Sequence, residues 1–412
     1  MKTRLVVIGA GMASGRMLEH LVKTAPDAFE ITLFNAENRG NYNRLMLSPV
    51  LAGEKTYEQI VTHDAEWYTR HGITTRFGER VASIDRAAKV VHGENGPVAY
   101  DKLVIATGSN PFVIPMPGHD LPGVISWRDW DDTQVMIGQQ QGTRAVVLGG
   151  GVLGLEAAAG MAARGMDVTV VHLESHLMNR QLDAEAGAML ARTLEARGLK
   201  IRCSTASEAI VAGPDGHVAG LRLKDGSTLP CDLLVMAVGI RPSTTLAQAA
   251  GLAVGRGITV DDHLRTSDPS IFALGECVEL NGALFGLVAP LYDQAEVLAA
   301  NLTGADQSYI PKETSTKLKV TGCDLFSAGC FAEGPDREEI LLSAPEDGIY
   351  KRLVIADQKL VGAVIYGDTE HGGFYYGLIR DGADISDLRE ALIFGPASAN
   401  AAAQPSRCSL AG

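Results

Sequence analysis

The chain has 412 residues, of which 46% are hydrophobic and 21% charged, an ordinary composition for a folded protein of about two or three domains. Its formal net charge of −13 argues against nucleic-acid binding, which needs a concentrated basic surface. A strand-like run starts at Arg4, and no apolar run approaches the roughly 20 residues of a membrane span. We therefore expect a cytoplasmic protein with no signal peptide and no membrane attachment.

The cysteines are spaced too widely for a metal cluster. Iron–sulfur clusters and structural zinc sites usually draw on a CxxC or CxC pair, and the sequence contains neither. We therefore expect no metal site and interpret the thiols as free and buried. The cysteines are Cys203, Cys231, Cys277, Cys323, Cys330 and Cys408.

The N-terminal elements predict a dinucleotide-binding unit. An apolar strand over residues 4–8 runs into a glycine turn at residues 9–15, and a helix covers residues 12–23. Glycines let the backbone approach a pyrophosphate, while unpaired N–H groups at the helix start face the anion. A second strand is predicted over residues 30–34, followed by Glu37, whose carboxylate could accept hydrogen bonds from a ribose diol. The alternative is a glutamate in a solvent-facing loop.

Three further segments precede the middle of the chain. Residues 41–48 are crowded with aromatic, basic and hydroxyl groups, and Arg44 among them could clamp a phosphate with two hydrogen bonds. Residues 100–108 are predicted to form an apolar strand that ends in a small-residue turn. Residues 111–122 hold four prolines and predict an extended connector out of the first domain.

Residues 145–156 repeat the N-terminal pattern of strand, glycine turn and helix, with the helix opening at Val152. The next predicted strand covers residues 168–172, and Glu174 follows it. Two such turns favour two dinucleotide sites over glycine turns in unrelated α/β units. We name residues 9–15 the first glycine loop and residues 149–154 the second glycine loop.

The later strands set the domain boundaries. A buried strand and small-residue turn at residues 233–239 close the second domain, and residues 258–277 return the chain to the first. The predicted fold class is α/β, with two Rossmann-like dinucleotide-binding domains, the first of them discontinuous, and a small α+β C-terminal domain. The predicted boundaries are 1–115 with 241–310 for the first domain, 116–240 for the second, 311–396 for the third and 397–412 for a flexible tail.

The third domain is predicted to combine strands, two of them joined as a hairpin, with short helices. The strands cover residues 317–320, 350–355 and 360–366, and the helices cover residues 374–380 and 387–393. Lysines near the start of the domain either steer an acidic partner or form a solvated strand face. They are Lys312, Lys317 and Lys319.

Five motifs over about residues 4–310 resemble the two-dinucleotide flavoprotein disulfide-reductase superfamily. They are residues 9–15, 106–108, 149–156, 237–242 and 266–277. The resemblance implies that the first domain binds FAD and the second NAD(P)H. It also implies that Gly275 and Glu276 stand where the superfamily places a Gly-Asp pair on the ribityl chain of FAD.

Within the superfamily, residues 42–48, residues 81–85 and the third domain are similar to the ferredoxin and rubredoxin reductase branch. Residues 177–183, 285–290 and 317–322 are similar to the flavin-containing N-terminal part of the large subunit of assimilatory NADH-dependent nitrite reductase. As a stand-alone chain, it therefore resembles an electron-transfer reductase of a nitrite or nitrate reductase system.

The resemblance implies two sets of cofactor-binding residues. The FAD set is Gly9, Gly11, Ser14, Glu37, Arg44, Val81, Ala106, Thr107, Gly108, Arg128, Gly275 and Glu276. The NAD set is Gly149, Gly151, Val152, Leu153, Gly154, Glu156, Glu174 and Gly239. Either arginine could instead be an ordinary surface residue. We expect NADH rather than NADPH because Glu174 offers a carboxylate and residues 171–174 offer no arginine for a 2′-phosphate.

Two positions depart from the family pattern. Pro49 stands where ferredoxin and rubredoxin reductases commonly carry a lysine that pairs with a glutamate equivalent to Glu156. The resemblance places Glu156 near the nicotinamide, and Lys55 is a candidate substitute for that lysine. Ser14 replaces the third glycine of the first loop, where a small side chain should suffice.

The implied mechanism stacks the nicotinamide on the flavin, passes hydride to flavin N5 and releases single electrons to an iron–sulfur protein or reductase subunit. It requires no general acid or base, and we predict no such catalytic residue. Alternatives are a rubredoxin or ferredoxin reductase for another pathway and a non-enzymatic, NADH-responsive redox sensor. A thiol reductase or NADH oxidase would need a cysteine beside the flavin, yet the first cysteine is Cys203. A homodimer is the oligomeric state that we consider for this chain.

Overall fold

The computed structural model describes residues 2–312, 315–320 and 322–397, and the chain divides into two compact units. Unit 1 comprises Met1–Phe112, Arg128–Thr133 and Gly239–Pro311, and unit 2 comprises Val113–Trp127, Gln134–Val238 and Lys312–Gly412. The predicted tail lies outside the described residues except for its first residue. The predicted boundary at residue 311 stays a prediction.

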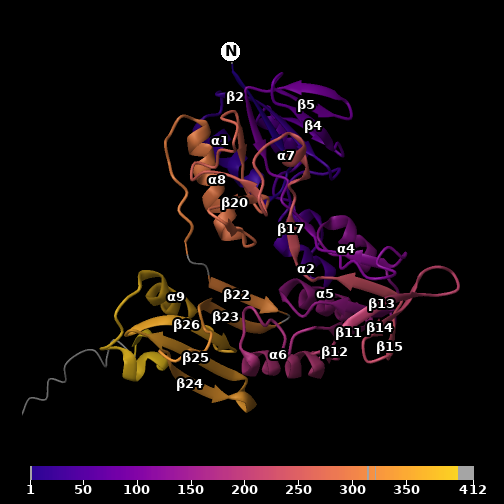
Figure 1. Ribbon diagram of the computed structural model, residues 1–412, viewed down its shortest axis with the longest axis vertical. Helices are drawn as coiled ribbons and strands as arrows, with labels where there is room; N and C mark the ends of the chain where they lie inside the picture. Colours follow the sequence, from indigo (N-terminus) through magenta and orange to yellow (C-terminus); the bar gives the residue numbers. More distant parts are fainter. Residues whose placement is uncertain (1, 313–314, 321, 398–412) are drawn as a thin grey trace, which may run out of the picture. The chain divides into compact units, whose positions relative to one another are not determined.

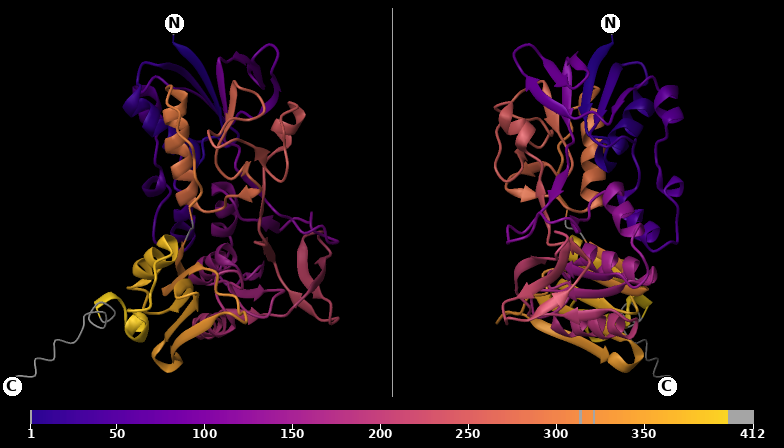
Figure 2. Two further views of the ribbon diagram at one scale, coloured as in Figure 1. Left: turned by 60° about the vertical axis from the view of Figure 1, so that its left-hand side comes forward. Right: turned by 90° about the vertical axis from the view of Figure 1, so that its right-hand side faces the viewer.

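A five-stranded parallel sheet, in the order β19-β7-β1-β2-β3, forms the centre of unit 1. Its strands are β1 (Thr3–Ile8), β2 (Phe29–Asn35), β3 (Thr74–Phe77), β7 (Lys102–Ile105) and β19 (Ile271–Ala273). Apolar residues run almost without break along β1 and β7, as expected for parallel strands covered on both faces. Helices α1 (Met12–Thr24) and α8 (Val288–Leu302) lie side by side (Figures 1 and 2).

The register of the strands shows which edge of this sheet could bind a ligand. Ile8 lies opposite Phe34 on one side and Ile105 on the other, so the three strands end together. The segments that follow them, including the first glycine loop, therefore meet at one edge of the sheet. Ligands bind at this carboxyl edge in open α/β sheets.

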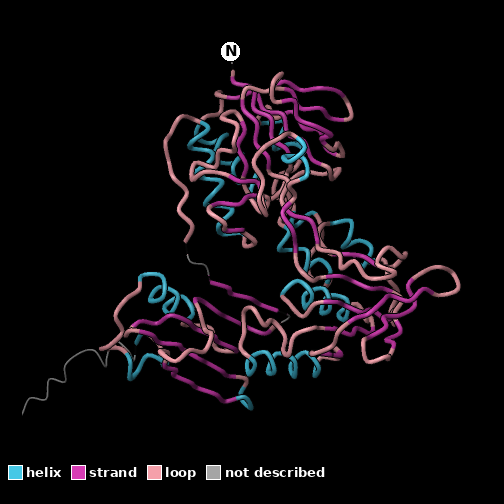
Figure 3. The backbone as a smooth tube through the Cα atoms, viewed as in Figure 1, coloured by secondary structure: helices cyan, strands magenta, loops and turns pink. Residues whose placement is uncertain are grey.

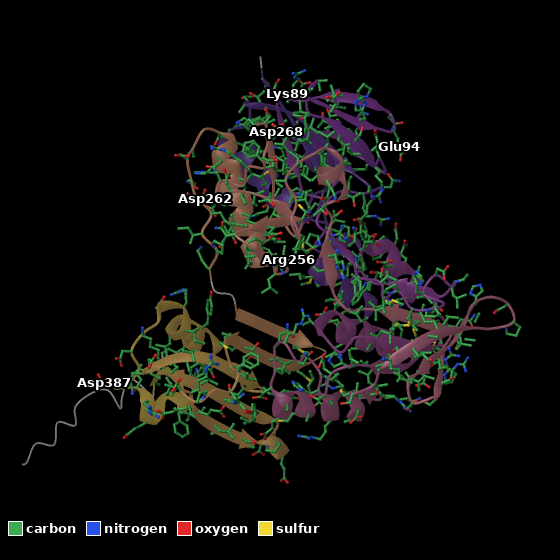
Figure 4. All side chains as sticks on the ribbon, in the orientation of Figure 1. Lys89, Glu94, Arg256, Asp262, Asp268 and Asp387 are labelled. Carbon is green, nitrogen blue, oxygen red and sulfur yellow. The ribbon has the colours of Figure 1, made fainter. Side chains whose placement is uncertain are left out.

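Smaller elements complete unit 1. Two short sheets contain β4 (Val81–Asp85), β5 (Val90–Gly93) and β6 (Gly96–Ala99), and β18 (Ile258–Thr259), β20 (Val278–Leu280) and β21 (Ala283–Leu284). A third pairs β8 (Ser109–Pro111) with β17 (Ile240–Pro242). The helices are α2 (Leu47–Leu51), α3 (Ala65–Arg70), α7 (Thr245–Ala249), η1 (Arg44–Met46) and η2 (Glu58–Ile60). Asp268, labelled in Figure 4, accepts a 2.8 Å hydrogen bond from Arg86 and ties the segment before β19 to the end of β4.

A second parallel sheet, in the order β12-β11-β10-β16-β9, lies in unit 2. Its strands are β9 (Val124–Ser126), β10 (Arg144–Leu148), β11 (Asp167–Val171), β12 (Lys200–Arg202) and β16 (Leu233–Met236). Leu148 lies opposite Val171 and Met236, so β10, β11 and β16 also end together. The helices are α5 (Val152–Ala163) and α6 (Ala184–Ala196), with α4 (Trp130–Ile137) crossing from unit 1. An antiparallel sheet adds β13 (Ser207–Ala212), β14 (Val218–Leu223) and β15 (Thr228–Pro230).

The C-terminal part of unit 2 is an antiparallel sheet in the order β22-β23-β26-β25-β24 (Figure 3). Its strands are β22 (Ser315–Val320), β23 (Cys323–Gly329), β24 (Glu338–Ala344), β25 (Ile349–Ala356) and β26 (Lys359–Tyr366). It carries η3 (Pro345–Asp347), α9 (Gly372–Asp381) and η4 (Arg389–Phe394). The helix predicted over residues 387–393 is therefore a 3-10 helix that starts and ends slightly later.

The predicted fold class is confirmed: two parallel dinucleotide-binding sheets precede a small α+β part, and unit 1 is assembled from separated segments. In the C-terminal part, β23 and β24 were not predicted. β24 is an edge strand that begins with two exposed glutamates, so it lacks the apolar run that indicated the predicted strands. Among the described helices, none has the length and apolar character needed to cross a membrane.

Candidate dinucleotide-binding sites

The first glycine loop joins β1 to α1 at the carboxyl edge of its sheet. Gly9 has a φ of +106°, and a Cβ on Gly9 would overlap the carbonyl oxygen of Ala106. Glycine is therefore required both by the backbone conformation and by the lack of space. Ala106 begins the turn, continued by Thr107 and Gly108, that follows β7. Two of the predicted FAD motifs thus touch each other.

Gly11 is the N-cap of α1 and is small for a different reason. Its φ of −79° suits any residue, and a Cβ there would meet none of the described atoms within 4 Å. No described side chain caps the helix start, whose N–H groups therefore lack a side-chain partner. Bare N–H groups beside open space fit a pyrophosphate.

Ser14 occupies the third position of the first loop without disturbing it. The side chain is fully buried, and its hydroxyl donates to the carbonyl oxygens of Gly9 at 2.6 Å and Gly11 at 3.0 Å. The hydroxyl therefore braces the turn from inside, which explains how a residue other than glycine fits there.

Glu37 lies two residues beyond β2 and is held by three neighbours, one of which is Arg39, whose Nε lies 3.8 Å from the carboxylate. The Tyr42 hydroxyl donates to its carboxylate at 2.8 Å, and the Arg44 guanidinium forms an ion pair with it. Only 14% of the Glu37 side chain is exposed. The alternative of a freely solvated loop glutamate therefore does not describe this residue.

Arg44 links Glu37 to a second acid–base pair in unit 1. It donates to the backbone carbonyl of Arg128 at 3.1 Å, and the Arg128 guanidinium forms an ion pair with Glu276. The Ser109 hydroxyl donates to the same Glu276 carboxylate at 2.7 Å. Both predicted FAD arginines are thus brought together, each beside a predicted FAD acid. Neither is an ordinary surface residue, since each guanidinium side chain is only 25% exposed.

Two polar residues in this site were missed by the sequence interpretation. Ser109 is one, and Gln294 of α8 is the other: its fully buried amide oxygen accepts from the Gly275 N–H at 2.8 Å. A glutamine among the mostly apolar residues of the buried face of α8 is the signal that could have identified it. Its role is to fix the turn before Glu276.

The second glycine loop repeats the geometry of the first in unit 2. Gly149 has a φ of +115°, and a Cβ there would overlap the carbonyl oxygen of Ala237. Gly151 is the N-cap of α5, with a φ of −83°, no capping side chain among the described residues and open space where a Cβ would be. At Gly154 a Cβ would overlap the Gly149 carbonyl oxygen, so the serine of the first loop has no counterpart. Gly151 therefore offers the same fit to a pyrophosphate as Gly11.

The acid of the second site differs from that of the first. Glu174 is exposed in the segment after β11. His172, just before it, accepts a hydrogen bond at Nδ1 from the Gly150 N–H at 3.1 Å. Burial lowers the pKa of His172 from its ordinary value. The strand end thus contributes a neutral acceptor to the glycine loop and an exposed carboxylate to the surface.

Several of the other predicted residues lie on β4 and on α5. Val81 is buried at the start of β4 and pairs with Gly93, away from any loop contact that we describe. Val152 opens α5, Leu153 is 36% exposed and Glu156 is half-buried on the same helix.

Gly239 accepts a backbone hydrogen bond from Phe112 at 2.9 Å. Pro49 lies within α2, and Lys55 is exposed beyond that helix. Of the lysines at the start of the third domain, Lys312 is exposed, and the side chains of the other two lie outside the described residues.

The cysteines give unit 1 no reactive thiol beside Glu276. Cys277 is fully buried, its thiol donates to the Leu274 carbonyl at 3.2 Å, and burial raises its pKa to about 11.

Asn43, just before Arg44, caps η1 by accepting from the Leu45 N–H at 3.1 Å. No group of three or more potential metal ligands occurs among the residues that the structure describes.

Comparison with known proteins identifies the family. Residues 3–298 match the pyridine nucleotide-disulphide oxidoreductase family, and this match covers both glycine loops. The chain belongs to this family. Residues 315–383 match the C-terminal domain of rubredoxin NAD+ reductase. The family assignment makes the chain an FAD-dependent NAD(P)H oxidoreductase, in agreement with the two glycine loops.

Two relatives and one solved structure refine this picture. The NAD(P)H nitrite reductase of Bacillus subtilis is 44% identical over 97% of this chain and 50% of its own length. The assimilatory nitrate reductase electron transfer subunit of the same organism is 41% identical over 89% of this chain and 48% of its own. The chain thus spans about half the length of these relatives. NADH:rubredoxin oxidoreductase from Clostridium acetobutylicum superposes with a TM-score of 0.79 at 26% identity, covering 96% of this chain and 99% of that one.

Proposed function

We propose that the chain transfers electrons from NADH through FAD to an iron–sulfur or related acceptor of a nitrite or nitrate assimilation system. One observation carries the proposal: two glycine loops in one chain each end in an uncapped helix with open space at the N-cap glycine. When bound, FAD would accept a hydride from NADH and release its electrons one at a time. The names of the Bacillus subtilis relatives support the pathway.

The protein's own residues bind and orient in this scheme. Gly11 and Gly151 leave room for the two pyrophosphates, while Arg44 and Arg128, each paired with an acid, would hold FAD at the first site. Glu174 supports NADH over NADPH because its exposed carboxylate suits a ribose diol and repels a 2′-phosphate. The acceptor would be an iron–sulfur protein or a reductase subunit, and the homodimer considered above stays a prediction.

A second candidate is a rubredoxin or ferredoxin reductase for another pathway. The match of residues 315–383 to the rubredoxin NAD+ reductase C-terminal domain favours it. Both candidates share NADH oxidation and differ only in the acceptor. A redox sensor would share the nucleotide site but would turn over slowly with every acceptor.

The test is anaerobic mixing of the purified, FAD-loaded protein with NADH and, separately, NADPH, followed through the visible absorbance of the flavin. Rapid bleaching by NADH, and slower bleaching by NADPH, is expected. The reduced protein is then mixed with ferredoxin, rubredoxin and a sirohaem-containing nitrite reductase fragment in turn. Bleaching by neither nucleotide would refute the reductase, and slow reoxidation by all three acceptors would favour the sensor.

A further inference from the structure

Each glycine loop is held by a side chain from the end of the neighbouring strand. In unit 1 the Ala10 N–H donates to Asn35 Oδ1 at 3.4 Å. In unit 2 the Gly150 N–H donates to His172 Nδ1 at 3.1 Å. Because each donor lies between the first two glycines of its loop, the two contacts are equivalent.

The strand register and the acids support this equivalence. Asn35 is the residue after Phe34, which pairs with the end of β1, and His172 is the residue after Val171, which pairs with the end of β10. In each case an acid follows two residues later, Glu37 in the first site and Glu174 in the second. The chain therefore uses an amide at one site and an imidazole at the other for the same contact.

The imidazole contact constrains the second loop closely. A Cβ on Gly150 would come within 2.8 Å of His172 Cγ, so the ring packs directly on the loop. On its other side, the Gly150 carbonyl accepts from the Met178 N–H at 2.8 Å. The peptide groups before and after Gly150 are therefore both fixed, immediately before the uncapped N-cap Gly151.

An imidazole accepts a hydrogen bond only through an unprotonated nitrogen. Since Nδ1 is the acceptor, the neutral ring carries its proton on Nε2. Protonation would place two N–H groups against each other and remove the bond. An amide in the same place, as at Asn35, has no such sensitivity.

We propose that His172 is a positioning residue of the second glycine loop, which as a neutral imidazole holds the Gly150 peptide in the orientation that receives NADH and which releases it on protonation. This role presupposes the NADH binding proposed above. It makes nucleotide affinity dependent on pH at the second site and independent of pH, through this contact, at the first.

The surroundings of the ring keep it neutral at physiological pH. Burial lowers the pKa of His172 below its ordinary value of 6.5, and the charge of the neighbouring His176 acts in the same direction, while a backbone hydrogen bond of His176 acts against it. The Asn179 side chain and the Glu174 carboxylate oppose this shift without reversing it. Affinity for NADH should therefore decline only at pH values below the ordinary histidine pKa of 6.5.

The experiment compares wild type with H172N, which copies the amide of the first site, and H172L, which removes the acceptor. The apparent Kd for NADH is taken from the concentration dependence of anaerobic flavin bleaching at pH 8 and at pH 5. At pH 8 we expect H172L to bind NADH roughly tenfold more weakly, because a buried N–H loses its partner. H172N should bind within about threefold of wild type and should lose the decline of affinity towards pH 5.

H217N is the matched control, because His217 is an exposed histidine of the same unit and lies outside the nucleotide site. Wild-type affinity in H172L at pH 8, or an unchanged pH dependence in H172N, would overturn the role of His172. If H172L does not fold, the role of His172 is still tested by comparing the pH dependence of the apparent Kd for NADH in H172N with that in wild type. Failure of NADH to bleach the wild-type flavin would instead refute the reductase function itself.

Discussion

Alanine at the second glycine of each loop should separate cofactor binding from folding. Gly11 and Gly151 have φ values of −79° and −83°, which alanine adopts without strain. The added methyl group would meet none of the described atoms within 4 Å at either position. We therefore expect G11A and G151A to fold with unfolding free energies within about 0.5 kcal/mol of wild type when no cofactor is bound.

The same methyl group would fill the space assigned to a pyrophosphate. In G151A, either the phosphates or the start of α5 has to move. We expect the apparent Kd for NADH to rise at least about tenfold, equivalent to about 1.4 kcal/mol. In G11A the same reasoning applies to FAD, which should be recovered at a markedly lower ratio of flavin to protein.

G149A is the control for a glycine that the fold itself requires. Its φ of +115° costs alanine about 1–2 kcal/mol, and the methyl group would also overlap the Ala237 carbonyl oxygen. Urea unfolding measures stability, flavin absorbance per chain measures FAD, and saturation of anaerobic bleaching measures NADH affinity. Unchanged NADH affinity in G151A, or destabilisation of G151A equal to that of G149A, would refute this reasoning.

Three further predictions concern other groups. N-ethylmaleimide at pH 7.5 should label the exposed Cys330, whose pKa is lowered by a neighbouring guanidinium, and should spare Cys277 with its pKa of about 11. Peptide mass spectrometry reads the labelling, and loss of NADH-dependent bleaching through modification of Cys277 would contradict the absence of thiol chemistry. Y350F removes a 2.7 Å hydrogen bond from the buried Tyr350 to Asp183 and should lower the unfolding free energy by about 1.5 kcal/mol in urea. An unchanged value would show that this contact contributes nothing. Burial, reinforced by adjacent acids, raises the pKa of Asp132 to about 6, so its contribution to stability is present below about pH 4 and is lost as the pH rises through about 6. D132N should therefore raise the melting temperature relative to wild type at pH 8 more than at pH 4, and equal differences at the two pH values would contradict this.

The central strands of the parallel sheets could be predicted because their signal is local. β1, β7, β10 and β16 are short apolar runs that end in small-residue turns, and burial on both faces demands that composition. β24 was missed because an edge strand needs no continuous apolar face. The strands flanking the Asp357 turn were found because they are long and buried.

The residues of the candidate sites also divide into those with a local sequence signal and those whose contacts depend on the folded chain. The glycine loops and the acids after the second strands depend on spacing along the chain, and the sequence placed them. The contacts of Ser109 and Gln294 depend on segments far apart in sequence, 167 and 19 residues from their partners. The acceptor role of His172 could not be predicted from the sequence, because it depends on which way the ring faces.

The two sites also differ in how firmly their acids are held, and this difference matches two different uses of a dinucleotide. Glu37 is 14% exposed, bound by Tyr42 and paired with Arg44, so the first site is rigid before any ligand arrives. Glu174 is exposed, next to Leu173, which is 66% exposed. A rigid, enclosed site loses little conformational entropy on binding and retains its ligand, whereas an exposed loop permits rapid exchange. This contrast favours a dinucleotide that stays bound at the first site and one that exchanges at the second, as the proposed roles of FAD and NADH require.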